Sequence, residues 1–381
     1  MAHRERVAII ATVAALGLAA CAPKIALPTA RATASPAQPT QAPPTATPTP
    51  PTPTGFEPRA MSAISETDFW VIGTRACASS ACPLEIMHTE DGGGSFKPIP
   101  APQGVYLAGN TSAPGPPQVG DLRFADASDG WVFGDTLWAT HDGGATWQQL
   151  TLGGTLLNVS QLEPGANGYV FAVFEICTDP STASDCVFRL ERSRATSNAW
   201  SVISPPGNPA GRQQIGVHGD TLWVMYFDRS TGLEWISRDD GNLWARGSMP
   251  CEPDLGGSFD PVNNSVIWAF CATGTMGGPS VSIDGGATYS SPPSTTLFTN
   301  GGLVAALSTQ HVFIVTPGVS IGVTTNGGRT YQPIEALSGA LWAGFTDSEV
   351  GYVLTQNPST LVYRLWRTRD AGSDWRAISF S

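Results

Sequence analysis

Short apolar runs separated by turn residues recur along the chain from about residue 56 onward. Seven of them are continuously apolar instead of alternating, as expected of strands that are buried on both faces. These runs are Phe69–Gly73, Trp131–Gly134, Tyr169–Phe174, Leu222–Phe227, Val266–Cys271, Val312–Thr316 and Tyr352–Thr355. Few stretches place apolar residues at the period of a helix. The pattern therefore predicts an all-β protein.

An eight-residue segment recurs seven times among these runs. It opens with Ser or Thr and closes on Phe, Trp or Tyr, and six copies carry Asp or Asn at the third place and Gly at the fifth. The copies begin at Thr89, Thr140, Ser193, Ser237, Ser282, Thr324 and Thr368. Their third residues include Asp91, Asp142, Asp239, Asp284, Asn326 and Asp370, and their last residues are Phe96, Trp147, Trp200, Trp244, Tyr289, Tyr331 and Trp375.

The residue types in this segment suit a tight hairpin turn. Hydroxyl and carboxylate oxygens can accept bonds from the N–H groups of a turn, and glycine takes a positive φ without steric cost. The aromatic ring can then fold back and cover the turn. The flanking runs 136–140 and 147–152 have the composition of strands, so we expect each copy to connect the two strands of a hairpin.

The spacing of the copies predicts the architecture. Their third places fall at 91, 142, 195, 239, 284, 326 and 370, in steps of 51, 53, 44, 45, 42 and 44. The copy at Ser193 has lost both Asp and Gly, but without it one step would be 97, about twice the rest. A period of 40-odd residues with about four strands each is typical of β-propellers. We predict a seven-bladed β-propeller of four-stranded antiparallel blades.

The segment resembles the Asp-box (BNR) repeat, Ser/Thr-x-Asp-x-Gly-x-x-Trp/Phe, of sialidases, sortilin-type receptors and photosystem II assembly factors. The resemblance covers about residues 56–381. It implies that the box is a structural turn on the rim of a propeller, so it bears on the fold and not on the function. The ring is expected to close by packing of the first blade on the last, unless residues 55–59 add a strand to the last blade.

The first 20 residues have the pattern of a targeting sequence. Arg4 and Arg6 precede the apolar run Val7–Ala19, which is too short to span a bilayer as a stable helix. Leu18–Cys21 is similar to a bacterial lipobox, which implies cleavage before Cys21 and lipidation of its thiol. An ordinary secretory signal with an incidental cysteine is the alternative.

A tether and a propeller domain are expected to follow. Residues 21–54 are mostly Pro, Thr and Ala, so they have almost nothing to bury and are predicted to be disordered, with polyproline II character. The propeller is predicted over residues 55–381. We therefore expect a domain in the bacterial cell envelope, outside the cytoplasm, that is lipid-anchored to the membrane.

Six cysteines besides Cys21 agree with export. They allow 15 pairings, and closeness in sequence favours three bridges. These are Cys77–Cys82, Cys177–Cys186 and Cys251–Cys271. Reduced thiols would conflict with the signal sequence. Because the histidines after the signal are scattered over different repeats, we predict no metal site and no cofactor.

The placement of the cysteines suggests a recognition face. In a four-stranded blade, second-to-third strand loops and blade-to-blade connections lie on the face opposite the Asp boxes, and all three predicted bridges and the longer connections fall there. We hypothesise that this opposite face binds a ligand with pre-ordered loops. The alternative is that the bridges only brace long loops. The candidate ligand-face residues are Arg75, Tyr106, Asp179, Asp185, Asp228, Arg229, Glu252 and Asp254.

The net charge restricts the partners. The chain carries −11, and removal of residues 1–20, with two Arg and one Glu, leaves −12. A domain with this negative charge is repelled by nucleic acid and by anionic membrane surfaces. We therefore expect contact with the membrane through the lipid anchor only. We predict a monomeric binding or assembly module for an envelope protein or a glycan.

An extracytoplasmic glycoside hydrolase is the alternative function. Sialidases carry an Arg-Ile/Val-Pro motif where this chain has Arg59-Ala60-Met61, and the tripeptide occurs nowhere else. Another glycosidase would need two carboxylates at the channel mouth. Candidates on the opposite face are Asp179, Asp185, Asp228, Glu252 and Asp254, but nothing marks a catalytic pair, so we assign no catalytic residue. The arginine patch of the photosystem assembly factors is not carried over either, because the arginine clusters here (189, 192, 194 and 364, 367, 369) lie on strands near the rim.

Overall fold

The computed structural model describes residues 55–75, 82–108, 117–151, 156–177, 186–206, 212–227, 232–252, 256–272, 276–294, 296, 298–299 and 302–380. The predicted signal peptide and tether, with Cys21, lie outside these residues. Strands dominate the described part, whose helical content is the three-residue 3-10 helix η2 (Glu335–Leu337). Within that part, no helix has the length and apolar character needed to cross a bilayer.

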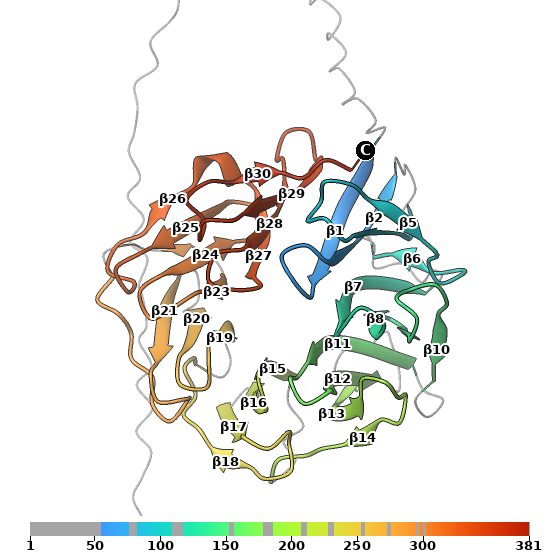
Figure 1. Cartoon of the computed structure of the whole chain (residues 1–381). Coiled ribbons are helices and arrows are strands. Elements are labelled where there is room, and N and C mark those ends of the chain that lie inside the picture. The colour runs from blue at the N-terminus through green and yellow to red at the C-terminus, as the bar shows by residue number, and fades with distance from the viewer. Residues whose placement is uncertain are drawn as a thin grey trace, which may run out of the picture. The chain divides into compact units, whose positions relative to one another are not determined.

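Seven antiparallel sheets follow one another around a ring, which confirms the predicted seven-bladed propeller (Figure 1). Blade one consists of β1 (Phe56–Ala63), β2 (Phe69–Arg75), β4 (Glu85–Thr89) and β5 (Lys97–Ile99), and blade two of β7 (Gln118–Phe124), β8 (Gly130–Gly134), β9 (Leu137–Thr140) and β10 (Gln148–Leu150). Blade three consists of β11 (Leu156–Pro164), β12 (Tyr169–Cys177), β13 (Cys186–Arg194) and β14 (Ser201–Val202). Blade four consists of β15 (Arg212–His218), β16 (Thr221–Phe227), β17 (Gly232–Ser237) and β18 (Ala245–Arg246). Blades five to seven are β19 (Gly257–Pro261), β20 (Ile267–Ala272), β21 (Met276–Ser282) and β22 (Phe298–Thr299); β23 (Leu303–Ala306), β24 (Val312–Thr316), β25 (Ser320–Thr324) and β26 (Gln332–Pro333); and β27 (Ala340–Phe345), β28 (Gly351–Gln356), β29 (Tyr363–Thr368) and β30 (Arg376–Ala377).

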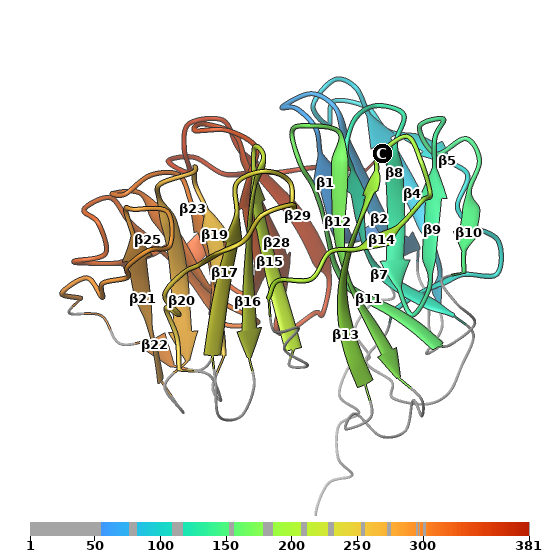
Figure 2. The same cartoon turned by 90° about the horizontal axis from the view of Figure 1, so that it is seen from below.

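The seven continuously apolar runs form the second strand of each blade, as predicted. Their largest side chains are fully buried, among them Trp70, Trp131, Trp223 and Trp268. Each of these second strands lies between two neighbouring strands of its own sheet and packs on both faces against adjacent blades. The core of the protein is therefore a series of apolar layers between blades, and the strands run from one face of the ring to the other (Figure 2).

The second sheet has two strands that the sequence pattern did not predict. The short strands β3 (Cys82–Pro83) and β6 (Tyr106–Leu107) extend it to six, and β6 pairs with β7 in parallel. They belong to the connections around the first blade, which return between blades one and two. Val105 and Leu107 are buried there. Burial of these apolar side chains holds the connection against the sheet edge.

The Asp boxes form the third-to-fourth strand turns with one hydrogen-bond pattern. In the second blade, Gly144 N–H donates to Thr140 Oγ1 at 2.8 Å, and Asp142 Oδ1 accepts from Thr140 Oγ1 and from Thr146 N–H at 2.8 Å each. The same three bonds recur in the boxes that start at Thr89, Ser237, Ser282, Thr324 and Thr368. The fifth-place glycines have φ between 82° and 94°, as predicted.

Every box also bonds to the loop between the first and second strands. Its fourth-place N–H donates to a carbonyl of that loop in six blades, for example Gly143 N–H to Ser128 O at 2.9 Å, and in the third blade the third-place Ala195 N–H donates to Gly168 O at 2.9 Å. Boxes and first-to-second strand loops thus share one face, the box face. The opposite face carries the second-to-third strand loops and the blade-to-blade connections.

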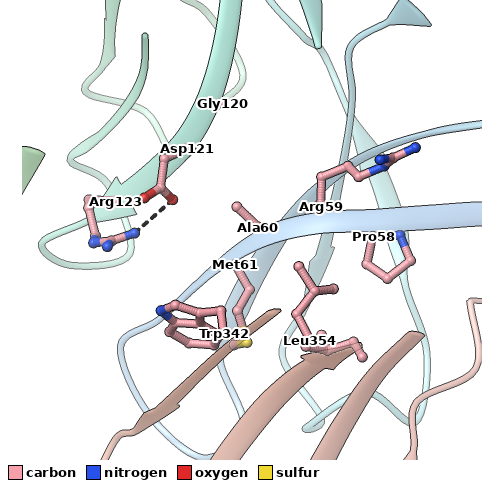
Figure 3. A pocket seen from close by; sticks show the side chains of 10 residues that line it. Pro58, Arg59, Ala60, Met61, Gly120, Asp121, Arg123, Trp342 and Leu354 are labelled. Carbon is pink, nitrogen blue, oxygen red and sulfur yellow. Dashed lines mark hydrogen bonds and ion pairs between the residues drawn. The ribbon is translucent and has the colours of Figure 1, made fainter. Parts of the chain in front are cut away.

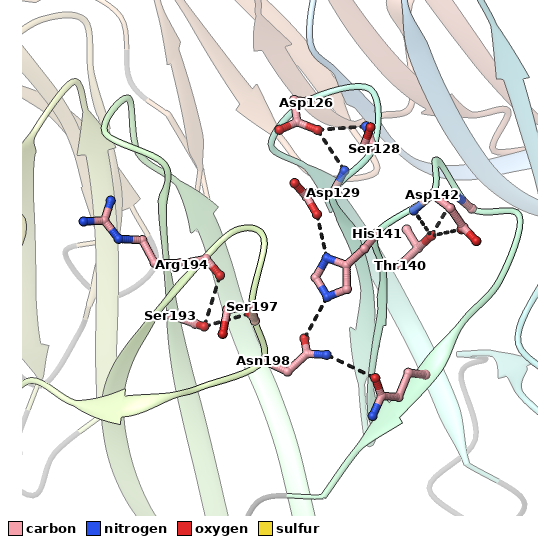
Figure 4. Close-up of polar contacts among 12 residues, drawn as sticks. Asp126, Ser128, Asp129, Thr140, His141, Asp142, Ser193, Arg194, Ser197 and Asn198 are labelled. Carbon is pink, nitrogen blue, oxygen red and sulfur yellow. Dashed lines mark hydrogen bonds and ion pairs between the residues drawn. The ribbon is translucent and has the colours of Figure 1, made fainter.

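The third-blade box keeps its place without its carboxylate. Ser193 Oγ donates to Ser197 O at 2.8 Å, and Asn198 bonds across to the second blade (Figure 4). Asn198 Oδ1 lies 3.3 Å from His141 Nε2, and His141 Nδ1 lies 2.5 Å from Asp129 Oδ1. These contacts join the degenerate box of the third blade to the second blade.

The ring closes by packing of the first blade on the last. Residues 55–59 add no strand to the seventh blade, because β1 pairs with β2 and contacts β28 and β29 through its face. Phe56 packs against Phe380 with ring centroids 4.9 Å apart, and Phe69 against Tyr352 at 5.2 Å, both pairs with tilted rings. Of the two ways of closing the ring that the sequence left open, the structure has the one without strand exchange.

Candidate binding channel

The innermost strands of all seven blades line a central channel. A cavity of about 580 Å³ occupies it, bounded by side chains of β1, β7, β11, β15, β19, β23 and β27. Its lining extends to Ile64, Ala125, Pro164, Val217, Pro261 and Thr346, where the inner strands end or pass into first-to-second strand loops. The cavity therefore lies at the box-face end of the channel.

A second, smaller cavity of about 160 Å³ adjoins the first at the junction of blades seven, one and two. Met61, Arg123 and Trp342 line both cavities. Figure 3 shows an apolar wall of Met61, Trp342 and Leu354 facing Asp121 and Arg123 across the space. The channel thus combines an apolar wall with an ionic one.

β-bulges place several of these side chains. Four inner strands have register shifts, between Pro58 and Ala60, Val119 and Asp121, Val159 and Gln161, and Ala340 and Trp342. A bulge adds one residue to a strand and re-aims the side chains that follow it. Asp121, Gln161 and Trp342 each come directly after a bulge and line the channel.

Arg123 is the centre of the ionic wall. Its Nη1 donates to Asp121 Oδ1 at 2.8 Å, and its Nη2 lies 3.3 Å from Glu163 Oε1 on the third blade. Burial alone would lower the pKa of Arg123, but Asp121 and Glu163 outweigh it and shift that pKa upward. Burial raises the pKa of Asp121, against the opposing effect of Arg123. The guanidinium therefore stays charged between two carboxylates.

Other inner-strand side chains bond to the backbone of the next blade. Phe124 N–H donates to Ser62 Oγ, Ile215 N–H to Gln161 Oε1 and Ala306 N–H to Asp260 Oδ2, each at 2.8 Å. These donors belong to the exposed edges of the inner strands, where unpaired N–H groups are otherwise costly. Burial, and to a lesser extent the charge of Glu163, raises the pKa of Asp260 to about 6. Asp260 thus holds two blades together and adds a third carboxylate to the channel.

Solved structures of similar fold include two of YCF48. One, described as YCF48 bound to D1 peptide, has a TM-score of 0.54 and 18% identity, over 83% of this chain and 94% of that one. YCF48 from Cyanidioschyzon merolae has a TM-score of 0.53 and 17% identity, over 85% and 98%. At this identity the likeness shows the fold alone. The chain is a seven-bladed β-propeller of the kind seen in YCF48.

Other comparisons add nothing on function. A Hadza microbial sialidase has a TM-score of 0.39 and 11% identity, over 74% of this chain and 66% of that one. No protein-family model and no curated protein sequence matches the chain.

The predicted ligand-face residues are described only in part. Asp179, Asp185, Asp228, Arg229 and Asp254 lie outside the described residues. Arg75 Nε donates to Glu85 Oε2 at 2.8 Å in an exposed ion pair, Tyr106 is half-buried on β6, and Glu252 is exposed. The structure does not bring these three together in a described cavity. The opposite face as a recognition surface stays a prediction.

The cysteines lie where the topology predicts. Cys251 and Cys271 form a disulfide with Cα atoms 5.0 Å apart, joining a blade-to-blade connection to β20. Cys82 and Cys186 are disulfide-bonded, and the register of β12 and β13 sets Cys186 opposite Cys177. Cys77, the predicted partner of Cys82, lies outside the described residues. Among those residues, no group of three or more His, Cys, Asp or Glu is arranged to hold a metal ion.

The channel residues were missed by the sequence analysis. Arg123, Glu163 and Asp260 sit at one place of the repeat, two residues before the backbone N–H that closes the first-to-second strand loop. Ser62 has the same place in the first blade. Aligning the inner strands by the phase of the boxes would have shown charged residues recurring inside apolar strands.

Proposed function

We propose that the protein is an extracytoplasmic, lipid-anchored binding module that recognises a protein or a glycan. The observation that carries this proposal is a closed ring whose channel combines ionic and apolar walls and holds a cavity of about 580 Å³, within the size range of ligand pockets. Support also comes from the similar propeller YCF48, which is described as bound to D1 peptide. The lipobox-like Leu18–Cys21 supports anchoring.

Site-specific photocrosslinking tests the proposal and assigns the face. Photoreactive residues replace the exposed Glu66 on the box face or the exposed Glu252 on the opposite face of the full-length protein. We expect one face to capture the same envelope component reproducibly and the other not to. Lack of capture at both faces, or turnover of fluorogenic glycosides by the purified protein, would contradict a pure binding module.

Anchoring is tested separately. Replacing Cys21 by Ser removes the thiol that lipidation needs, so we expect the variant to leave the membrane fraction. A variant that stays on the membrane would overturn the lipid anchor without affecting the binding proposal.

A further inference from the structure

The channel holds more negative charge than its arginine can neutralise. Asp121 and Glu163 contact the guanidinium of Arg123, and Asp260 adds a third carboxylate to the lining of the larger cavity. Arg59 also borders the smaller cavity, but it stacks over the Tyr363 ring at 3.5 Å and Figure 3 shows it directed away from Asp121. Three carboxylates against one cation leave a surplus of negative charge in a partly desolvated space, where charge is costly.

Two carboxylate oxygens in the channel lack a partner among the described residues. Asp121 uses Oδ1 for both Leu122 N–H and Arg123 Nη1, and Asp260 uses Oδ2 for Ala306 N–H. Asp121 Oδ2 and Asp260 Oδ1 accept no hydrogen bond within the described part of the chain. Each can accept a bond from a donor inside the channel.

The smaller cavity supplies an apolar wall of limited length. Met61, Trp342, Leu354 and Leu365 line one side of it. At roughly 30 Å³ for each water-sized group, its volume of about 160 Å³ holds a chain of about five heavy atoms.

We propose that the channel binds a cation carried on a short apolar stem, namely a primary ammonium or guanidinium group on three to five carbons. The stem lies along Met61 and Trp342, and the charged head donates to the free oxygens of Asp121 or Asp260. A lysine or arginine side chain of a protein partner and a free alkylamine share this chemistry. The proposal rests on the proposed binding function and specifies the ligand class.

The structural alternative is that the carboxylates only position Arg123 and cap strand edges. In that role the carboxylate oxygens are already bonded to protein donors, and no added ligand should bind them. Replacing Asp260 by Asn separates the two roles, because the amide oxygen can still accept the Ala306 N–H bond while the charge is lost. Glu335 is exposed and lies outside the channel, so Glu335→Gln is the matched control.

Calorimetric titration of the full-length protein with n-butylammonium, methylammonium and butyrate is the test. We expect n-butylammonium to bind, about fourfold more tightly for each buried CH₂ beyond methylammonium, and butyrate not to bind. Asp121→Asn or Asp260→Asn, whichever removes the carboxylate that accepts from the ammonium, should weaken binding about tenfold, and Glu335→Gln should leave it unchanged. Thermal unfolding checks that each variant folds.

The outcomes also distinguish a partner side chain from a free amine, and failure of the cation site from failure of the proposed binding function. Tighter binding of a blocked lysine peptide than of n-butylammonium indicates a partner side chain, and the reverse indicates a free amine. Equal affinity in wild type, Asp121→Asn and Asp260→Asn, or binding of butyrate as well as of the amine, would overturn the cation site. If no cation binds but photocrosslinking still captures a partner, the cation site fails and the binding module stands.

Discussion

Single residues in left-handed conformations show how strongly the box turn constrains its sequence. The fourth place has a positive φ in six boxes, and four of them use glycine there. The other two hold Asp240 at φ 58° and Ala371 at φ 56°. The fifth-place glycine has a second reason to be glycine, because a Cβ at Gly144 would lie 2.4 Å from Ile99 Cδ1 of the preceding blade. Backbone freedom and close packing thus select the same residue.

Replacing Ala371 by glycine should stabilise the protein. The left-handed conformation costs a residue with a Cβ about 1–2 kcal/mol, and the extra chain entropy of glycine offsets part of the gain. We expect the free energy of unfolding to rise by about 0.5–1 kcal/mol, measured from the urea midpoint. Gly143→Ala, the reverse change in the second blade, should destabilise. A stabilising Gly143→Ala would contradict this account of the turn.

A carboxyl group is buried between blades four and five. Glu234 has no exposed surface, accepts one bond from the Tyr289 hydroxyl at 2.9 Å, and has no described partner for Oε2. Burial, reinforced slightly by Asp284, raises its pKa to about 8 in spite of the Tyr289 bond. Glu234 is therefore protonated at neutral pH in the folded protein.

Replacing Glu234 by glutamine should remove a pH dependence of the free energy of unfolding. The pKa of Glu234 is higher folded than unfolded, so its contribution to stability is complete below about pH 4.5 and is lost as pH rises to about 8. At roughly 1.4 kcal/mol per pH unit, the free energy of unfolding of wild type should fall by about 2–3 kcal/mol between pH 5 and pH 7 because of Glu234. The Glu234→Gln variant should not show this loss. Urea unfolding at both pH values measures it, with Glu335→Gln as control. Parallel stability curves would show that Glu234 is ionised in the fold.

At the scale of the element, the boxes act through a repeated set of bonds. Hydrogen bonds from the Thr146 hydroxyl and N–H, with a smaller one from Thr140, lower the pKa of Asp142. Those from Thr288 and Ser282 lower the pKa of Asp284 to about 2. The bonds to the ionised form are therefore present above the ordinary aspartate pKa and are lost as pH falls through the lowered value.

Removal of one box carboxylate should weaken its blade. Asp142→Ala deletes the acceptor for Thr140 Oγ1, Thr146 N–H and Thr146 Oγ1. We expect the melting temperature to fall by several degrees, on the order of 5 °C, in differential scanning calorimetry. Asp135→Ala, an exposed aspartate of the same blade, should have no effect. Equal effects of the two changes would argue against a structural role for the box.

The sequence predicted the elements that a local pattern specifies. The box turns and the buried second strands follow from residue type and spacing alone. The bulges before Asp121 and Trp342, and the added strands β3 and β6, depend on how blades meet, which no local period records. A second repeat was not predicted. In five first-to-second strand loops one side chain accepts bonds from two backbone N–H groups, namely Ser65, Asp126, Asn263, Ser308 and Asp347. Their varied side chains share an acceptor role that residue identity conceals.

For the whole molecule, the junction of blades seven and one decides whether the ring is closed. Phe56, Phe69 and Tyr352 share one buried cluster there, and Phe56 is 7% exposed. The contact holds without pairing of strands between the two blades, so its strength comes from apolar burial.

Truncation at this junction should destabilise the whole propeller. Phe56→Ala removes a buried ring and its contact with Phe380, which we expect to cost about 3 kcal/mol. Phe298→Ala makes the same change in the fifth blade, where the ring is 8% exposed, and provides the comparison. If closure matters, only Phe56→Ala should also speed proteolysis at both blades one and seven. Equal protease resistance of the two variants would mean that the ring does not depend on this contact.

Closure by packing means that no strand is shared across the junction of blades seven and one. Every blade contributes a complete sheet, and none borrows a strand from the far end of the polypeptide. A circular permutant that fuses residue 381 to residue 55, and opens the chain between two other blades, would therefore retain all seven sheets. The order of the blades around the axis, and not the point at which synthesis begins, defines this toroid.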